Sequence, residues 1–220
     1  FKEPWLNPKG FEQIVYDVLA NTQDMNIIEK PEPEDTPFYI NNGTINVGNT
    51  NGKVILQTFS LESLVRVAEV FQGKVPMCFL LWKGTGATDL TYDDPLGYAS
   101  FINLGVKYKA HFIGPCIAGA PNDYPELDQP WQDYLIHRAK MKNHPYTFDT
   151  YDQMAKYFGQ YNFGVADGMF NPPYLDALFT NHSDMSINYM ITHGWRKSPA
   201  SQTLVDAREV LRKLGYLDNN

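Results

Sequence analysis

Short apolar segments that alternate with helical patterns constrain the fold of this 220-residue chain more than any other feature. The segments 53–59 and 75–82 are almost continuously apolar, and the apolar residues between them recur at helical spacing. A strand that is apolar on both sides is typical of a parallel sheet with both faces covered. We therefore expect an α/β fold of strand–helix–strand units with right-handed crossovers.

The rest of the chain continues this alternation, with further strands expected at 110–113, 145–148 and 177–180. Cap residues and prolines mark the expected helix starts, which lie near Asn7, Ser60, Asp94, Pro130, Thr150 and Ser198. Gly105 and Gly215 are expected to end two of these helices. The pattern indicates a single domain over residues 1–220 with a terminal helix near 199–215. Spacing alone does not distinguish a doubly wound sheet from a barrel.

Composition and charge exclude some classes of partner. Hydrophobic residues make up 43% of the chain, which suits one large domain with a real core. The net charge of −7 argues against a nucleic-acid partner, because such proteins usually carry a basic face. No apolar run is long enough to form an integral membrane segment. A small phosphorylated substrate stays possible because it needs only a local cation.

The cysteines and two sequons bear on the compartment. Cys78 lies in an apolar segment, which favours two free thiols at Cys78 and Cys116, although one disulfide stays open. The sequons begin at Asn42 and Asn181 and favour a secreted or periplasmic protein. The chain begins with Phe1, so we expect a processed chain or part of a longer gene product.

Nucleotide and hydrolase motifs are absent from the sequence. The segment 84–86 (Gly-Thr-Gly) lacks the third glycine of a dinucleotide fingerprint and the lysine of a P-loop. No Gly-x-Ser-x-Gly nucleophile elbow occurs, which argues against an α/β-hydrolase.

Five short segments occur in an order that carries a family resemblance. They are Phe-Lys-Glu-Pro-Trp at 1–5, Val-Ile-Leu-Gln-Thr-Phe-Ser at 54–60, Phe-Ile-Gly-Pro at 112–115, His-Pro-Tyr-Thr-Phe at 144–148 and Leu-Phe-Thr-Asn at 178–181. Over roughly residues 1–190 this order resembles the C-terminal part of glycerophosphodiester phosphodiesterases, closest to the bacterial periplasmic type. The chain departs from the family at Asn181, where an aspartate is usual, and at 175–177, where a Gly-Val-Asp/Asn-Gly run is usual.

The resemblance implies a TIM-like (β/α)8 barrel, of which this chain supplies about five strands plus the end of another. It implies metal-dependent hydrolysis of glycerophosphodiesters to glycerol 3-phosphate and an alcohol. The family's catalytic histidines and metal carboxylates lie upstream of the position of Phe1. We therefore expect no metal ligands in this chain, a calcium or magnesium ion bound mainly by upstream residues, and no activity from this chain alone. The missing N-terminal part is its expected partner, because an open sheet edge is unstable.

Four residues are the candidate site, since active sites of such barrels lie at the carboxyl ends of the strands. Lys2 matches the family's motif lysine and would neutralise phosphate charge. Gln57 is a substrate-binding residue or a structural amide of the core. Trp82 and Tyr146 would shape the alcohol pocket, or serve as core aromatic residues.

Other polar residues receive no role in the site. His111 and His144 are expected to be structural, and Asp123, Glu126 and Asp128 are expected to be solvated in a long loop. Two alternatives to the phosphodiesterase stay open. One is a noncatalytic barrel fragment that binds a ligand or partner, and the other is a phospholipase D-like enzyme of the same fold, similar to the spider toxins.

Overall fold

The computed structural model describes residues 1, 6–21, 40–41, 44–45, 54–82, 94–123, 125–161, 175–194 and 212. The chain forms two compact units, Phe1–Ser186 and Ile187–Asn220. Lys2 and nearly all of the expected terminal helix at 199–215 lie outside the described residues. The sheet and the candidate site belong to the first unit.

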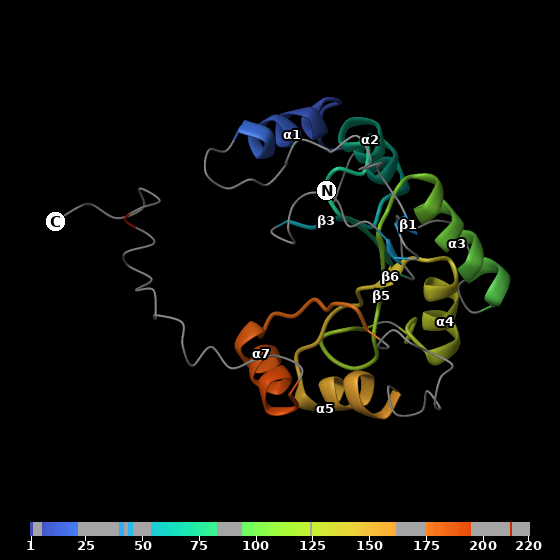
Figure 1. Cartoon of the computed structure of the whole chain (residues 1–220), viewed down its shortest axis with the longest axis vertical. Helices are drawn as coiled ribbons and strands as arrows, with labels where there is room; N and C mark the ends of the chain where they lie inside the picture. Colours follow the sequence, from blue (N-terminus) through green and yellow to red (C-terminus); the bar gives the residue numbers. More distant parts are fainter. Residues whose placement is uncertain are drawn as a thin grey trace. The chain divides into compact units, whose positions relative to one another are not determined.

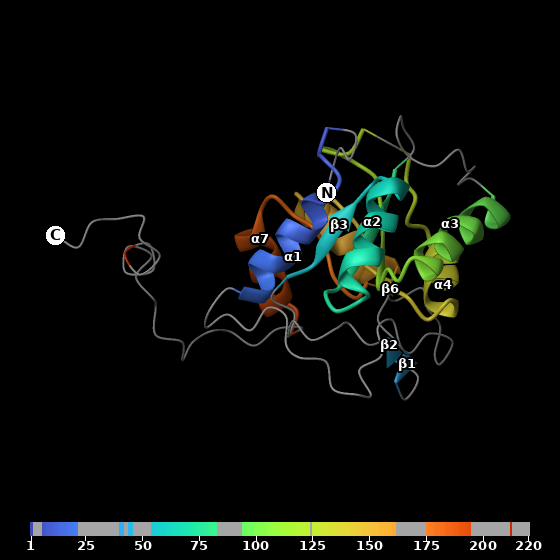
Figure 2. The ribbon, with the colours of Figure 1, turned by 90° about the horizontal axis from the view of Figure 1, so that it is seen from above.

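A parallel four-stranded sheet confirms the expected α/β fold class (Figures 1 and 2). Its strands follow one another in the order of the sequence. They are β3 (Leu56–Thr58), β4 (Met77–Leu81), β5 (Phe112–Pro115) and β6 (Lys142–Asn143). A separate antiparallel pair is formed by β1 (Ile40–Asn41) and β2 (Thr44–Ile45). The sheet is consistent with a TIM-like barrel, but the described residues do not show barrel closure.

An extended segment flanks one edge of the sheet, and the N-terminal residue flanks the other. Beyond β6, the Ala177 N–H donates to the Asn143 carbonyl at 3.2 Å and the Phe179 N–H donates to the Pro145 carbonyl at 2.9 Å. These bonds advance in the same direction on both segments, so 177–179 runs parallel to β6. At the other edge, the Phe1 ammonium donates to the Gln57 carbonyl at 3.0 Å. The structure therefore places Phe1 beside β3.

Helices cover one face of the sheet and form the main core. α2 (Leu61–Phe71), α3 (Pro95–Lys107) and α4 (Pro130–Arg138) contact β3, β5 and β6 respectively. Strand residues that alternate toward these helices, such as Phe79 and Ile113, belong to the main cluster of buried apolar residues. The Phe79 ring stacks on Phe101 of α3 with centroids 4.2 Å apart. α1 (Phe11–Asn21) packs on α2.

The opposite face of the sheet carries a smaller cluster. Its buried members are Cys78, Leu80 and Phe112, and the partly buried residues packed against it are Ile55, Phe59, Tyr146 and Phe179. Both cysteines are buried free thiols. Burial raises the pKa of the Cys78 thiol, and it raises the pKa of the Cys116 thiol to about 12.

Local capping chemistry explains the helix starts that the sequence predicted correctly. The Ser60 hydroxyl accepts from the Ser63 N–H, and the Asp94 carboxylate accepts from two backbone N–H groups of α3. α5 (Tyr151–Met154) begins with a capping box at Thr150 and continues as the π-helix η1 (Ala155–Gln160). α7 spans Ser183–Thr192. None of the helices described is long and apolar enough to cross a membrane.

Three expected boundaries were wrong. α1 begins at Phe11 instead of Pro8, after a turn in which Gly10 has φ +100°. α3 does not end at Gly105 but continues to Lys107. The glycine instead allows α3 to pack closely against β5. A Cβ there would lie 3.0 Å from Ile113 Cδ1. The regular part of β6 is 142–143, not the expected 145–148.

Candidate functional site

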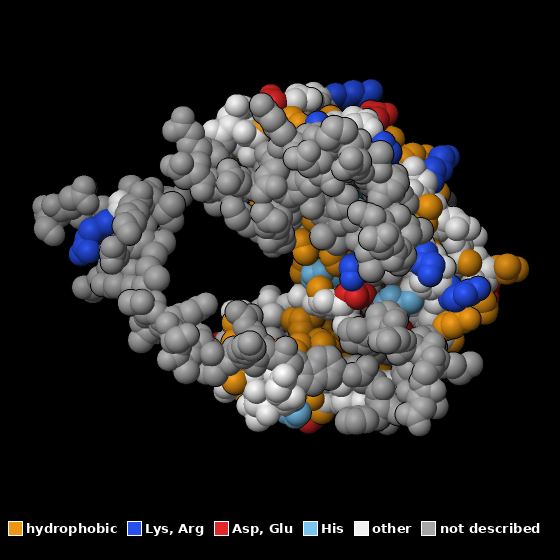
Figure 3. All heavy atoms as spheres, in the orientation of Figure 1, with side chains coloured by type: hydrophobic (Ala, Val, Ile, Leu, Met, Phe, Trp, Pro, Cys, Tyr) orange, Lys and Arg blue, Asp and Glu red, His pale blue; other side chains and the backbone are white. Residues whose placement is uncertain are grey.

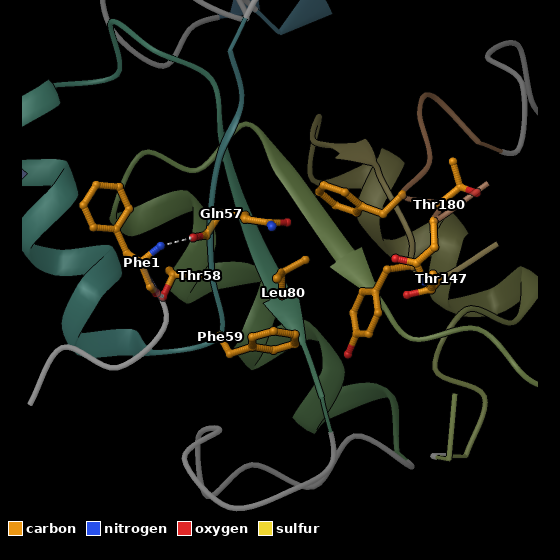
Figure 4. Close-up of a pocket in the computed structure, with 10 residues that line it drawn as sticks. Phe1, Gln57, Thr58, Phe59, Leu80, Thr147 and Thr180 are labelled. Atoms are coloured by element: carbon orange, nitrogen blue, oxygen red, sulfur yellow. Dashed lines mark hydrogen bonds between the residues drawn. The ribbon is translucent and has the colours of Figure 1, made fainter. Parts of the chain in front are cut away.

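A cavity of about 440 Å³ lies at the carboxyl ends of the parallel strands (Figure 4). Its lining residues are Phe1, Gln57, Thr58, Phe59, Leu80, Tyr146, Thr147, Phe179, Thr180 and Asn181. These residues come from five separate parts of the sequence, which the sheet order brings together.

Gln57 projects from β3 into this cavity. Its backbone pairs with Phe1 and β4, while its side chain is exposed and points into the space above Leu80 (Figure 4). No hydrogen bond joins this amide to another described residue, so it offers both a donor and an acceptor to a ligand. Of the two readings of Gln57, the structural core amide does not fit its exposure.

Aromatic rings form one wall of the cavity. The Tyr146 hydroxyl donates to the Leu81 carbonyl at 2.9 Å, which fixes the ring against the end of β4. Phe59 meets Tyr146 edge to face with centroids 5.5 Å apart, and it meets Trp82 in the same way at 5.6 Å. The structure therefore brings Gln57 and Tyr146 to one cavity, whereas Trp82, which contacts Phe59, is not among the lining residues.

The opposite rim is held by two amide side chains. The Asn122 amide donates to the Thr147 carbonyl at 3.0 Å and accepts from the Thr147 N–H at 3.1 Å. Asn181 donates to the two carboxylate oxygens of Asp149, from its backbone at 2.9 Å and from its side chain at 2.8 Å. An aspartate at position 181 has no such side-chain donor, so the amide fits its partner Asp149.

The loop that follows β5 is tied to the helix that follows β6. The Gln153 amide donates to the carbonyls of residues 118–120 and accepts from two backbone N–H groups at the start of α5. The Glu126 carboxylate accepts from Lys156 at 2.9 Å and from Tyr157 and Tyr161. The expectation that Glu126 is solvated was therefore wrong, because its carboxylate anchors this loop.

Two histidines are structural, as expected. His111 is buried, and its Nδ1 accepts from the Met77 N–H at 3.1 Å. His144 is 4% exposed and lies between the rings of Phe112 and Phe179. Burial lowers the pKa of each imidazole to about 4, so both are neutral at pH 7.

A buried ionic network that the sequence did not predict surrounds the start of β6. The Asn143 side-chain amide donates to Asp128 and to Asp133, at 2.9 Å in each case. The His137 ring contacts Asp133 at 3.2 Å and Asp176 at 2.9 Å. Asp128 is 0% exposed, so the expectation that it is solvated was wrong.

The charges in this network shift several pKa values. Burial alone would lower the pKa of His137, but its bonds to Asp133 and Asp176 outweigh burial and raise that pKa to about 9. Burial raises the pKa of Asp128 and of Asp133. Figure 3 shows basic, acidic and histidine side chains close together over the region of β5 and β6. The network contacts α4 through Asp133 and His137, and none of its residues lines the cavity.

The described residues include neither a set of metal ligands nor Lys2, the lysine that matches the family motif. In the described ranges, no group of three histidine, cysteine or acidic side chains is placed to hold a metal ion. Lys2 follows Phe1, which lines the cavity, but Lys2 itself lies outside the described residues.

Comparison with known proteins finds a weak structural similarity. No family model and no curated protein matches the chain. A solved structure with partial similarity is a Silicibacter pomeroyi protein provisionally assigned as a glycerophosphoryl diester phosphodiesterase. The TM-score is 0.44 and the identity 11%, over 64% of this chain and 39% of that one. The chain thus spans less than half of that protein, and a similarity this weak carries no argument about function.

Proposed function

We propose that the complete protein is a metal-dependent phosphodiesterase that hydrolyses glycerophosphodiesters to glycerol 3-phosphate and an alcohol. The observation that supports this most is the composition of the cavity. Four of the five segments that resemble the family contribute lining residues to it: 1–5, 54–60, 144–148 and 178–181. These segments lie far apart in the sequence, so their meeting at one cavity is the arrangement that a shared active site requires.

Each proposed residue meets one chemical requirement of phosphodiester hydrolysis. Water must add to phosphorus while the bond from phosphorus to the alcohol oxygen breaks and that oxygen takes up a proton. Lys2 is proposed to neutralise the nonbridging oxygens, and Gln57 to donate to a phosphate or glycerol oxygen. Tyr146 and Trp82 are proposed to shape the alcohol end. A calcium or magnesium ion, held mainly by residues upstream of Phe1, would supply Lewis-acid stabilisation when bound.

A second candidate is a noncatalytic barrel that binds a small ligand. The Asn181–Asp149 pair favours it, because an amide replaces a family carboxylate at the rim of the cavity and both Asp149 oxygens are engaged. The described lining side chains are amides, hydroxyls and apolar groups, which bind ligands but do not by themselves activate water. Secretion or export to the periplasm is proposed for either candidate, from the sequons and the resemblance.

One experiment distinguishes the two candidate functions. The complete natural protein, with any residues that precede Phe1, is incubated with glycerophosphocholine, and glycerol 3-phosphate is measured. The phosphodiesterase predicts release that a chelator abolishes and that added calcium or magnesium restores. Saturable binding of glycerophosphocholine without any release in either metal would favour the noncatalytic barrel.

A further inference from the structure

One extended segment connects the buried ionic network to the cavity. Asp176 of the network begins this segment, and residues 179–181 at its other end line the cavity. Figure 4 shows Thr180 beside Thr147, on the side of the cavity opposite Phe1. Extended chain advances about 3.3 Å per residue, so a displacement of Asp176 reaches the lining residues within about 10 Å.

Asp176 holds the start of the segment with its side chain and its backbone. The carboxylate accepts from the Asn143 N–H at 2.8 Å and from the Lys142 ammonium at 3.1 Å, and it contacts the His137 ring at 2.9 Å. The Asp176 N–H donates in turn to the Asn143 carbonyl at 3.0 Å. Both carboxylate oxygens are therefore engaged, and the side chain is only 8% exposed.

These contacts define the register of the segment. Beyond Asp176, the bonds of the Ala177 and Phe179 N–H groups to Asn143 and Pro145 are backbone hydrogen bonds. Backbone bonds alone specify the register of a short strand weakly, because equivalent bonds form after a shift of two residues. The Asp176 carboxylate meets its charged partners in one register, which brings the lining residues to their places.

His137 makes its contacts in the protonated form. One ring nitrogen lies 3.2 Å from the Asp133 carboxylate and the other lies 2.9 Å from the Asp176 carboxylate. An imidazole that bonds to two ionised acceptors has a proton on each nitrogen and is positively charged. Its pKa of about 9 agrees with this arrangement. Loss of the proton leaves one ring nitrogen as an acceptor that faces another acceptor.

Other titratable groups surround the network and bear on its pH dependence. They come from α3, the loop before α4, α4 itself, β6 and the residue after β6: Tyr98, Asp128, Asp133, Lys142 and His144. Burial raises the pKa of Tyr98 far above its usual value and lowers that of His144 to about 4, so neither changes charge between pH 6 and pH 9. Burial raises the pKa of Asp128 and Asp133, so a transition is assigned to His137 by substitution of that residue.

We propose that Asp176 is a positioning residue of the cavity, whose contacts with His137 and Lys142 hold residues 179–181 where the ligand binds. This inference rests on the proposed function for the identity of the ligand. Deprotonation of His137 removes one of these contacts, releases the segment and weakens ligand binding. The network thus links alkaline pH to the cavity without touching the ligand.

The first test follows the segment in the absence of a ligand. 4-Fluorophenylalanine replaces Phe179 in the complete protein, and its fluorine-19 resonance is recorded from pH 6 to pH 10. We expect a change in the resonance with a midpoint near pH 9, and no such change in His137→Gln. Asp176→Asn keeps the shape of the side chain and removes its charge, so the midpoint should fall by about 1–3 pH units.

A label elsewhere in the cavity separates this local change from unfolding. 4-Fluorophenylalanine at Phe59, a lining residue that follows β3, should show no transition near pH 9. A constant resonance at position 179, the same transition at both positions, or an unchanged midpoint in Asp176→Asn would overturn the proposal. If Asp176→Asn fails to fold, the comparison of the parent with His137→Gln still decides.

The second test connects the segment to the ligand through steady-state kinetics on glycerophosphocholine. At pH 7, Asp176→Asn is expected to raise KM roughly 5-fold or more and to change kcat less, because Asp176 touches no reacting atom. Asp184→Asn, a change at an exposed acid of α7, is the matched control and should keep the parent KM. A parent KM that rises from pH 7 to pH 10, and a flat KM in His137→Gln, would support the coupling.

The two tests distinguish this inference from the proposed function. A transition at position 179 with no hydrolysis of glycerophosphocholine would support the positioning of the segment and remove the enzyme. Hydrolysis with the same KM in the parent and in folded Asp176→Asn would keep the enzyme and overturn the positioning role.

Discussion

At the scale of single residues, Asn181 and Asp149 show how the rim of the cavity depends on one amide. Two hydrogen bonds from Asn181 satisfy the Asp149 carboxylate. Asn181→Asp would place two carboxylates against each other, and we expect the free energy of unfolding to fall by about 1 kcal/mol at pH 7. The loss should shrink as salt is raised, because salt screens the repulsion between exposed carboxylates. Asn181→Ala is the control, whose loss should not depend on repulsion; identical salt profiles for the two variants would contradict this account.

Lys2 is the residue on which the proposed chemistry depends most. If it neutralises phosphate charge beside the metal, Lys2→Ala in the complete protein should lower turnover by about 100- to 1000-fold. Metal affinity should be largely unchanged. Lys2→Arg should rescue only in part, because the planar guanidinium is larger than an ammonium. Steady-state kinetics on glycerophosphocholine at saturating calcium and at saturating magnesium measure this, and near-normal turnover in Lys2→Ala would exclude the role.

Sequence reasoning found the residues of the cavity better than those of the ionic network. Gln57 and Tyr146 are a polar and an aromatic residue near strand ends, and that position is readable from the sequence. The network of Asp128, Asp133 and Asp176 around Asn143 is not, because each carboxylate taken alone resembles a solvated loop residue. Its partners lie 10 to 33 residues from Asn143, so only the fold brings them together.

At the scale of elements, the sequence predicts the starts of helices better than the bounds of strands. Ser60 and Asp94 cap helices through bonds to residues two or three positions away, so local sequence is sufficient. The strand expected at 145–148 lies too far along the chain, because Lys142 and Asn143 are polar and polar residues are typical of loops. Their side chains are satisfied by distant acidic groups in the folded chain, which lets polar residues occupy a buried strand.

The prediction at the scale of elements concerns Gly114 in β5. A Cβ at this position would lie 2.6 Å from Leu80 Cδ2, 2.8 Å from Cys78 Sγ and 2.9 Å from the His144 carbonyl oxygen. Because one of these neighbours is backbone, the clash cannot be relieved by a rotamer change alone. Gly114→Ala is therefore expected to destabilise the protein by about 1–3 kcal/mol. Thermal melting beside the exposed control Ser100→Ala measures this, and an unchanged Tm would show that the strands are further apart than described here.

At the scale of the whole molecule, the buried network makes stability depend on pH. Since the folded pKa of His137 is about 9, its contribution is fully present below about pH 6.5 and is lost as pH rises through 9. The raised pKa values of Asp128 and Asp133 act in the same direction. The pKa of Asp176 is lowered by His137, its backbone contact and Lys142 despite burial, so its contribution is lost as pH falls below the usual range of aspartate.

We therefore expect the free energy of unfolding to fall by about 3 kcal/mol from His137 alone between pH 6 and pH 10. The measurement is denaturant unfolding of the complete protein across this range. His137→Gln should be less stable at pH 6 and should show a flatter profile. A parent profile that is flat or rises with pH would contradict the ionic contacts of His137.

The central claim is that the cavity at the carboxyl ends of the strands is a phosphodiester site. The most direct measurement is kcat/KM for glycerophosphocholine in the complete protein and in Gln57→Leu, which removes the amide and keeps a side chain of similar length. The account predicts metal-dependent hydrolysis by the parent and a kcat/KM lower by about 10- to 100-fold in a folded Gln57→Leu protein, as expected for loss of one hydrogen bond to a charged group. Equal kcat/KM in the two proteins, or no hydrolysis by the parent with either metal, would contradict it.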